Sequence, residues 1–290
     1  MVAEVLEHLA PERGGVFVDC TVGLAGHAAQ LLERGATRLI GLDRDPAALA
    51  IARGQLARFG DRVELVHTDY RELVRVLDAM GVAGVAGVLA DLGVSSMQLD
   101  AAGRGFSFRR DDPLDMRMDT SAGPTAADLI AAADERALAD VIYQFGEERH
   151  ARRVARFIVE RRKAGRIETT GQLADVVRRA VPRKGFVRID PATRTFQAIR
   201  IWVNKELDGL DVFVGDVARR LEPGGRMAII TFHSLEDRVV KHTLRQLQAA
   251  GDIGLKVLTK RPIAPSDAEV ERNPRARSAK LRVAERVEQS

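Results

Sequence analysis

A glycine-containing loop near the start of the chain has the composition of a ligand-binding turn. The segment 19–27, DCTVGLAGH, follows a short apolar run and opens a predicted helix. Glycines let the backbone turn tightly and let a ligand approach a helix N-terminus without a Cβ in the way. Asp43 ends the next apolar run, where a carboxylate can accept two hydrogen bonds from ribose hydroxyls. The pattern predicts binding of NAD, FAD or S-adenosylmethionine; the structural alternative is a tight turn with a capping Asp.

Two features of this loop favour S-adenosylmethionine over NAD. The fingerprint G-x-G-x-x-G is absent, and an acid, Asp19, ends the first apolar run. A carboxylate there repels a pyrophosphate but suits the positively charged end of S-adenosylmethionine.

Further polar and aromatic residues follow the third and fourth apolar runs. Tyr70 comes after the third run and could stack on an adenine, or else be a half-exposed loop aromatic. Asp91 ends the fourth run and is followed by LGVSS and then Gln98. An acid beside small residues leaves room for a substrate and can accept its proton, although a helix N-cap series explains the same residues.

The apolar runs recur with a βαβ rhythm. They begin at Val16, Arg38, Val63 and Val85, and helical periodicity fills the intervals. Such spacing predicts a parallel sheet, whose carboxyl edge gathers the loop residues. The next comparable run, 226–232, begins about 140 residues later, where a spacing of about 23 residues was expected. It follows a predicted helix that ends before Pro223. The candidate last strands are 256–259 and 278–284.

The long interval predicts an inserted helical domain at 104–204. Helices are expected at 126–145, 147–162 and 170–181. The remaining residues, 1–103 and 205–290, then form one discontinuous α/β domain of Rossmann-like type.

Charge is unevenly distributed in this chain of 290 residues and net charge +4. From Glu147 to Arg188 there are 13 Lys and Arg against five acids, which gives +8, and 272–290 carries six basic residues against two acids, which gives +4. Clustered positive charge predicts a polyanionic partner; a solvated arginine-rich helix is the alternative. We expect one helical face to bind RNA phosphates, through Arg149, Arg152, Arg153 and Arg156.

Composition narrows the class of protein. Hydrophobic residues are 46% and charged residues 30%, which is typical of a globular chain. The longest apolar run, 81–90, is too short to span a bilayer, so no membrane partner is expected. The single cysteine, Cys20, and the early Glu4 and Glu7 favour a cytoplasmic setting.

The chain resembles the bacterial 16S ribosomal RNA cytosine-N4 methyltransferases, which use S-adenosylmethionine. The matching stretches keep the family's order over nearly the whole chain: 19–27 (DCTVGLAGH), 43–46 (DRDP), 91–96 (DLGVSS), 104–108 (RGFSF), 113–119 (PLDMRMD), 143–148 (YQFGEE), 191–200 (PATRTFQAIR), 232–238 (FHSLEDR) and 273–278 (NPRARS). The resemblance implies a Rossmann-like methyltransferase sheet with an inserted all-α domain. Its implied substrate is a cytosine in the decoding region of 16S rRNA, in the small ribosomal subunit or its late assembly particle.

Site residues carry over from this resemblance position by position. The cofactor contacts implied are Ala25, Gly26, His27, Asp43, Tyr70, Asp91 and Gln98. The family usually has a second glycine in place of Ala25, a change that costs little if this residue has a negative φ, and often a Phe in place of Tyr70. A His-x-Pro-Val segment usual before Val2 is missing, which loosens substrate binding or reflects a trimmed start.

The proton acceptor remains open among three residues, Asp91, Asp115 and His233. The Asp/Asn/Ser-Pro-Pro-aromatic motif of many amino-methyltransferases is absent, and each candidate could instead make a structural hydrogen bond. Planar walls for a flipped base are expected from Phe106, Phe108 and Trp202, with core packing as the alternative.

No metal site is expected, because the histidines and Cys20 lack metal-ligand spacing. Two other functions stay open on the residues alone. One is an NAD-dependent oxidoreductase, and the other is an RNA-binding assembly factor with a vestigial cofactor pocket.

Overall fold

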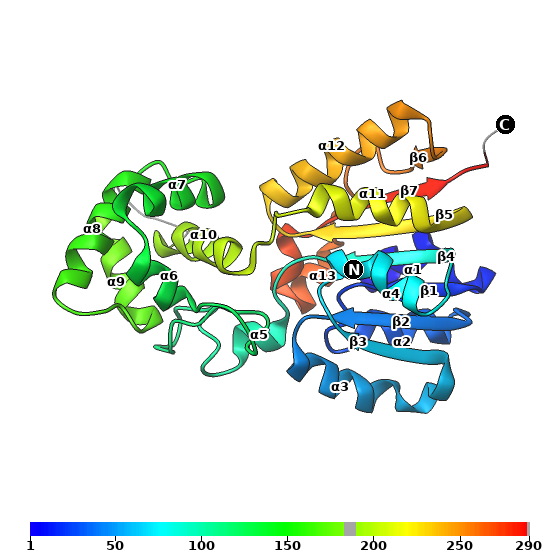
Figure 1. Cartoon of the computed structure of the whole chain (residues 1–290), viewed down its shortest axis with the longest axis horizontal. Helices are drawn as coiled ribbons and strands as arrows, with labels where there is room; N and C mark the ends of the chain where they lie inside the picture. The colour runs from blue at the N-terminus through cyan, green and yellow to red at the C-terminus, as the bar shows by residue number, and fades with distance from the viewer. Residues whose placement is uncertain (183–189, 289–290) are drawn as a thin grey trace. The chain divides into compact units, whose positions relative to one another are not determined.

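The chain divides into two compact units. The computed structural model describes residues 1–182 and 190–288. One unit joins Met1–Gly93 to Leu207–Ser290 and holds the sheet; the other, Val94–Glu206, is built from helices (Figure 1). The helical unit begins at Val94 where the sequence predicted residue 104, because Val94 and Leu99 pack against its apolar core.

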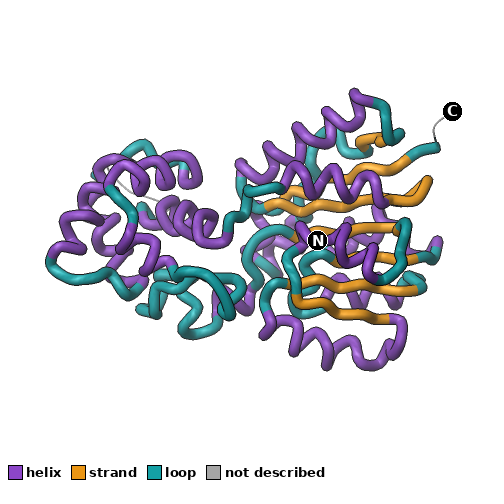
Figure 2. Tube along the Cα trace, in the orientation of Figure 1, coloured by secondary structure: helices purple, strands orange, loops and turns teal. Residues whose placement is uncertain are grey.

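The sheet has seven strands in the order β3-β2-β1-β4-β5-β7-β6. Figure 2 draws the strands in orange, with helices on either side of them. Neighbours from β3 to β5 are parallel, whereas β7 runs antiparallel to β5 and β6. The strands are β1 Val16–Asp19, β2 Arg38–Asp43, β3 Val63–His67, β4 Val85–Asp91, β5 Leu221–Thr231, β6 Leu255–Val257 and β7 Lys280–Arg286. This order confirms the expected Rossmann-like methyltransferase sheet.

Helices cover both faces of the sheet because successive strand residues point to opposite sides. On one face Val18, Ile40 and Val88 pack with α4 Leu73–Ala79, α11 Leu210–Arg220 and α12 Ser234–Ala250. On the other face Phe17, Leu39 and Leu89 pack with α1 Val2–Leu9, α2 Gly26–Glu33 and α3 Pro46–Leu56. Each fully buried Leu, Ile or Phe contributes about 1.5–3 kcal/mol. The short α13 Asp267–Arg272 completes the named helices of this unit.

The helical unit has its own apolar core. Leu138, Ile158 and Leu173 are fully buried there and come from three different helices. The helices are α5 Ser96–Asp100, α6 Ala126–Ala132, α7 Glu135–Gly146, α8 Ala151–Lys163, α9 Thr170–Ala180 and α10 Ala192–Asn204. A second core explains why this segment interrupts the βαβ rhythm without disturbing the sheet.

Two helix predictions in this unit were wrong in their boundaries. The expected helix 126–145 is broken, because Ala133 is extended and the Asp134 side chain caps α7 by accepting a hydrogen bond from the Ala137 amide. The helix expected from residue 147 begins at Ala151, because Glu147 adopts a left-handed conformation with φ 49° where α7 ends.

The strand expected at 226–232 is longer than predicted. β5 begins at Leu221, directly after α11, and pairs with β4 on both sides of an irregularity at Val85 and Gly87. Pro223 therefore lies inside the strand, where a register shift accommodates it.

Some sequence expectations concern residues that receive no structural description. Arg183, Lys184 and Arg188 of the basic segment lie outside the described residues. Within the described ranges, every helix is too short or too polar to cross a bilayer.

Candidate active site

Three acids end three neighbouring strands of the sheet. Asp19, Asp43 and Asp91 end β1, β2 and β4, which are adjacent in the order β2-β1-β4. Burial raises the pKa of Asp19 to about 7, and the charges of the other two acids add to the shift. The carboxyl edge of the sheet is thus an acidic region in a partly desolvated setting, as a cationic ligand requires.

The loop after β1 turns through left-handed residues. Gly23 has φ 49° and Ala25 has φ 66°, and α2 begins at the next residue, Gly26. Replacement of the family's glycine by Ala25 was expected to cost little if this residue had a negative φ, and that condition is not met. A residue with a Cβ pays roughly 1–2 kcal/mol for a left-handed conformation. Ala25 is fully buried, so the contacts of its methyl group offset part of that cost.

Asp43 anchors this loop to the second strand. Its Oδ2 accepts a hydrogen bond of 2.8 Å from the Gly23 amide, and its Oδ1 accepts one of 2.8 Å from the Asp45 amide. Burial nevertheless raises the pKa of the carboxyl group. Each oxygen keeps a second lone pair, so the predicted acceptance of ribose hydroxyls is chemically open.

Asp91 and His27 face each other across the loop. His27 Nδ1 lies 3.9 Å from Asp91 Oδ2. Burial raises the pKa of Asp91 to about 7 and lowers the pKa of His27 to about 4, so the imidazole is neutral at neutral pH. Two buried atoms, Asp91 Oδ1 and His27 Nε2, find no hydrogen-bond partner among the described residues. A buried unpaired acceptor is costly unless a ligand satisfies it.

Thr21 joins the loop to the fourth strand, a contact that sequence reasoning missed. Its hydroxyl accepts a 2.7 Å hydrogen bond from the Asp91 amide, and the Thr21 amide donates to Asp19 Oδ1 at 3.1 Å. The hydroxyl inside the DCTVG segment was the available signal, but its partner depended on β1 lying beside β4.

Tyr70 is more buried than an adenine platform would suggest. Only 8% of its surface is exposed, and its ring meets Phe213 edge-on with centroids 4.6 Å apart. The Arg71 guanidinium lies 5.6 Å from the ring centroid and pairs with Asp69 at 2.7 Å. Burial raises the pKa of Tyr70, so it stays neutral. Adenine contact by Tyr70 remains a prediction.

Gln98 belongs to the helical unit. It forms a capping box at the start of α5: the Gln98 amide donates to Ser95 Oγ at 3.1 Å, and the Ser95 amide donates to Gln98 Oε1 at 3.0 Å. The glutamine therefore has a local structural role beside its predicted cofactor contact.

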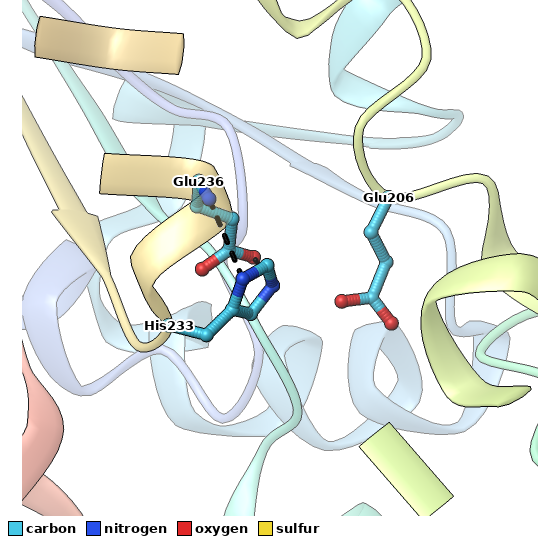
Figure 3. Close-up of side chains that lie close together, drawn as sticks. All are labelled: Glu206, His233 and Glu236. Carbon is cyan, nitrogen blue, oxygen red and sulfur yellow. Dashed lines mark hydrogen bonds and ion pairs between the residues drawn. The ribbon is translucent and has the colours of Figure 1, made fainter. Parts of the chain in front are cut away.

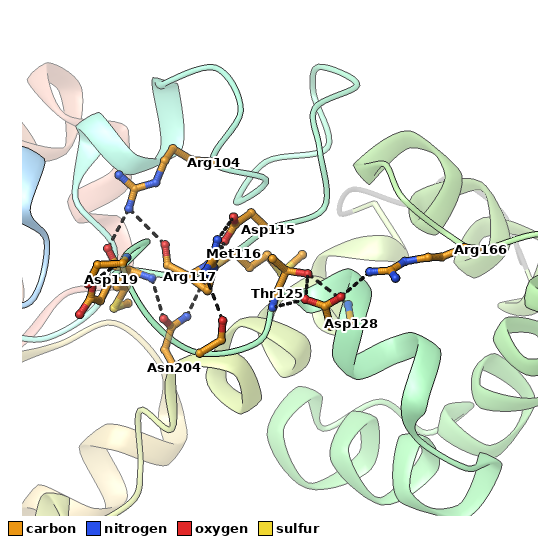
Figure 4. A network of polar contacts seen from close by, with 12 residues as sticks. Arg104, Asp115, Met116, Arg117, Asp119, Thr125, Asp128, Arg166 and Asn204 are labelled. Atoms are coloured by element: carbon orange, nitrogen blue, oxygen red, sulfur yellow. Dashed lines mark hydrogen bonds and ion pairs between the residues drawn. The ribbon is translucent and has the colours of Figure 1, made fainter.

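Asp115 is held in a polar network of the helical unit (Figure 4). Its two carboxylate oxygens accept hydrogen bonds of 2.8 Å from Arg117 Nε and Nη2. Asn204 fixes the same segment through Met116 and Met118, and Met116 has a left-handed φ of 62°. Both carboxylate oxygens already have charged donors, which favours the structural alternative for this candidate.

His233 is the N-cap residue of α12 and is paired with Glu236 (Figure 3). Its Nδ1 accepts a 3.4 Å hydrogen bond from the Glu236 amide, and its Nε2 lies 3.1 Å from Glu236 Oε1. Glu236 Oε2 in turn accepts from the Phe232 amide at 3.0 Å. Figure 3 also draws Glu206, which closes the helical unit and pairs there with Arg200. His233 is thus a buried, partnered residue.

The candidate base-pocket aromatics lie in the core of the helical unit. Phe106 is 8% exposed, and Phe108 meets Phe196 edge-on with centroids 4.8 Å apart. Trp202 is partly buried against the same core. Core packing therefore accounts for all three, and a wall for a flipped base remains a prediction.

Comparison with known proteins gives a match over almost the whole chain. The model of the MraW methylase family matches residues 1–287. A protein of Sorangium cellulosum named ribosomal RNA small subunit methyltransferase H is 54% identical over 284 residues, covering 98% of this chain and 89% of that protein. Proteins of the same name from Geotalea uraniireducens and Synechococcus elongatus are 50% and 52% identical, covering 99% and 98% of this chain and 97% and 92% of their own lengths.

Proposed function

This chain belongs to the MraW methylase family, and we propose that it transfers a methyl group from S-adenosylmethionine to the N4 amino group of a cytosine in the decoding region of 16S ribosomal RNA. The observation that carries the proposal is the acidic carboxyl edge of β1, β2 and β4 beside a glycine loop. The RNA substrate rests on the relatives, whose name specifies small-subunit ribosomal RNA.

The cofactor choice is supported by the charge of the site. Burial raises the pKa of Asp19, Asp43 and Asp91, and the charges of the last two raise that of Asp19 further. A pyrophosphate would meet repulsion from these three acids. The cofactor's positive charge would be attracted to these carboxylates instead. Asp43 would accept the ribose hydroxyls.

Asp91 is the strongest of the three candidates for the proton acceptor. S-adenosylmethionine supplies the methyl group: an N–C bond forms at N4 as the C–S bond breaks, and one proton leaves N4. Asp91 has a pKa of about 7, suited to a base at neutral pH, and one free carboxylate oxygen among the described contacts. Asp115 is held in an ion pair with Arg117, and its Oδ1 already accepts two hydrogen bonds from that residue. His233 Nδ1 already accepts from the Glu236 amide.

A methylation assay tests the proposal directly. Small ribosomal subunits and late assembly particles lacking the modification are incubated with labelled S-adenosylmethionine, and the RNA is digested to nucleosides. We expect label in N4-methylcytidine from the decoding region and none from fully modified particles. Label in another nucleoside, or particle binding without label, contradicts the proposal, and the second outcome favours an assembly factor. The proposal places the protein in the cytoplasm.

A further inference from the structure

One face of α8 carries four exposed arginines, of which Arg153 lies with its guanidinium 5.5 Å from the centroid of the Phe157 ring. Arg149 lies just before the helix, and Arg152, Arg153 and Arg156 lie along it; all four are exposed. The opposite stripe, which includes Val154 and Ile158, is fully buried in the core of the helical unit. Within residues 1–182 and 190–288, none of the four guanidinium groups makes a hydrogen bond or an ion pair.

Most other arginines of this unit do have protein partners. Ion pairs join Arg117 to Asp115, Arg166 to Asp128, Arg178 to Asp190, Arg194 to Glu148 and Arg200 to Glu206. Arg162 donates instead to the carbonyl groups of Ile130 and Ala133 at the end of α6. Those acids are therefore committed elsewhere. Glu160 is the one acid of α8 and lies four residues after Arg156, so four arginines against one acid leave this face with a charge of +3.

The position of these charges opposes the stability of the helix. Arg152 and Arg153 occupy its first turn, where the helix dipole disfavours cations. That turn contains no acid, and the N-cap residue His150 makes no side-chain cap. Arg149, Arg153 and Arg156 also repel one another at spacings of three and four residues. Folding therefore does not explain the face, whereas a bound anion would relieve both the repulsion and the unfavourable dipole.

We propose that the α8 arginine face, Arg149, Arg152, Arg153 and Arg156, binds backbone phosphates of the small-subunit RNA, an inference that rests on the proposed function. Guanidinium groups bind phosphate oxygens with two parallel hydrogen bonds. Residues one turn apart along a helix are spaced by about 5.4 Å, so one face can contact successive phosphates of a strand. RNA supplies one phosphate per nucleotide, a denser array of anions than an ordinary acidic protein surface.

Binding of unmodified particles at several salt concentrations tests this inference. The four arginines are changed together to Gln, and a matched control changes four exposed arginines of the sheet unit, Arg34, Arg53, Arg245 and Arg261, to Gln. We expect the α8 variant to bind about tenfold more weakly or worse, and the slope of log K against log salt to fall by about three, since each phosphate contact contributes about 0.7–0.9. The control should change the slope by less than one.

Further measurements separate the possible outcomes. Both variants should keep their circular dichroism spectrum and their affinity for S-adenosylmethionine. A third variant, in which the same four arginines of α8 are changed to Lys, should keep most of the salt slope. Unchanged particle affinity and slope in the α8 variant, or an equal loss in the control, overturn the inference while methylation by the parent protein still supports the proposed function. If the parent protein neither binds nor methylates particles, that result contradicts both this inference and the proposed function. Competition by polyglutamate as strong as by 16S RNA also overturns it, in favour of an acidic protein partner.

Discussion

The two units handle charge in opposite ways. At the carboxyl edge of the sheet, Asp19, Asp43 and Asp91 are held by backbone amides and neighbouring side chains, and burial raises the pKa of each. On α8 the four arginines are exposed and make no ion pair within the described residues. A small cationic ligand needs a few partly desolvated acids at fixed positions, whereas a long polyanion needs accessible cations. Under the proposed function, the first arrangement suits the cofactor and the second suits the RNA backbone.

The largest expected effect comes from Asp91→Asn. The amide keeps the size of the side chain but cannot accept a proton, so we expect kcat to fall by about 10²–10⁴-fold. Rapid-quench methylation of saturating particles measures the rate. A twofold change or less would assign proton acceptance to another group and leave Asp91 a ligand of the cofactor only.

Asp19→Asn should stabilise the protein and weaken its binding of S-adenosylmethionine. The pKa of Asp19 is about 7 in the folded chain and 3.8 ordinarily, so its contribution to stability falls as pH rises from about 4 to about 7. Removing the charge should raise the free energy of unfolding by up to about 4 kcal/mol at pH 8, and by less at pH 5. Urea denaturation at both pH values measures this. Equal gains at pH 5 and pH 8 would show that the charge is not the cause.

Asp43→Ala should weaken S-adenosylmethionine binding by about 1.5–3 kcal/mol per ribose hydrogen bond lost. The Gly23 and Asp45 amides also lose their acceptor, so the variant should be less stable. Calorimetry gives the affinity, and Asp61→Ala, an exposed acid of the same unit, is the matched control. Unchanged affinity would refute the ribose assignment.

Cofactor binding should release protons near pH 7. A positively charged ligand favours the ionised forms of Asp19 and Asp91, whose pKa values are about 7, so affinity should rise as pH increases through 7 and then level off. The slope should approach tenfold per pH unit for each proton released. Calorimetry in buffers of different ionisation enthalpy counts the protons. S-adenosylhomocysteine, which lacks the sulfonium charge, should release fewer, and equal release by both ligands would contradict this assignment.

The smallest effect is expected in the helical unit. Asp115→Asn removes one charge from the pair with Arg117 and should lower stability by about 1 kcal/mol. Thermal unfolding measures the loss. A fall in kcat beyond that of an equally destabilised variant, together with an altered pH profile, would return Asp115 to the candidates for proton acceptor.

Sequence by itself determined the strands that carry the site. The boundaries of β1 to β4 match the predicted runs, because turn residues and apolar runs act locally. The inserted helical segment could also be predicted, because it lengthened one interval in the otherwise regular spacing of the apolar runs. The arginine stripe of α8 followed from helical periodicity alone, and the structure leaves all four side chains exposed.

Only the tertiary structure decided how each charged or polar residue is used. The sequence could not rank Asp91, Asp115 and His233 as proton acceptors. In the structure, Asp91 keeps an unpaired buried oxygen among the described contacts, whereas the other two have local partners. The hydrogen bond from the Asp91 amide to the Thr21 hydroxyl likewise depends on β1 lying beside β4, which is distant in sequence. The physical reason is that burial and pairing arise from neighbours brought together by folding, whereas a sequence pattern reports only the spacing along one element.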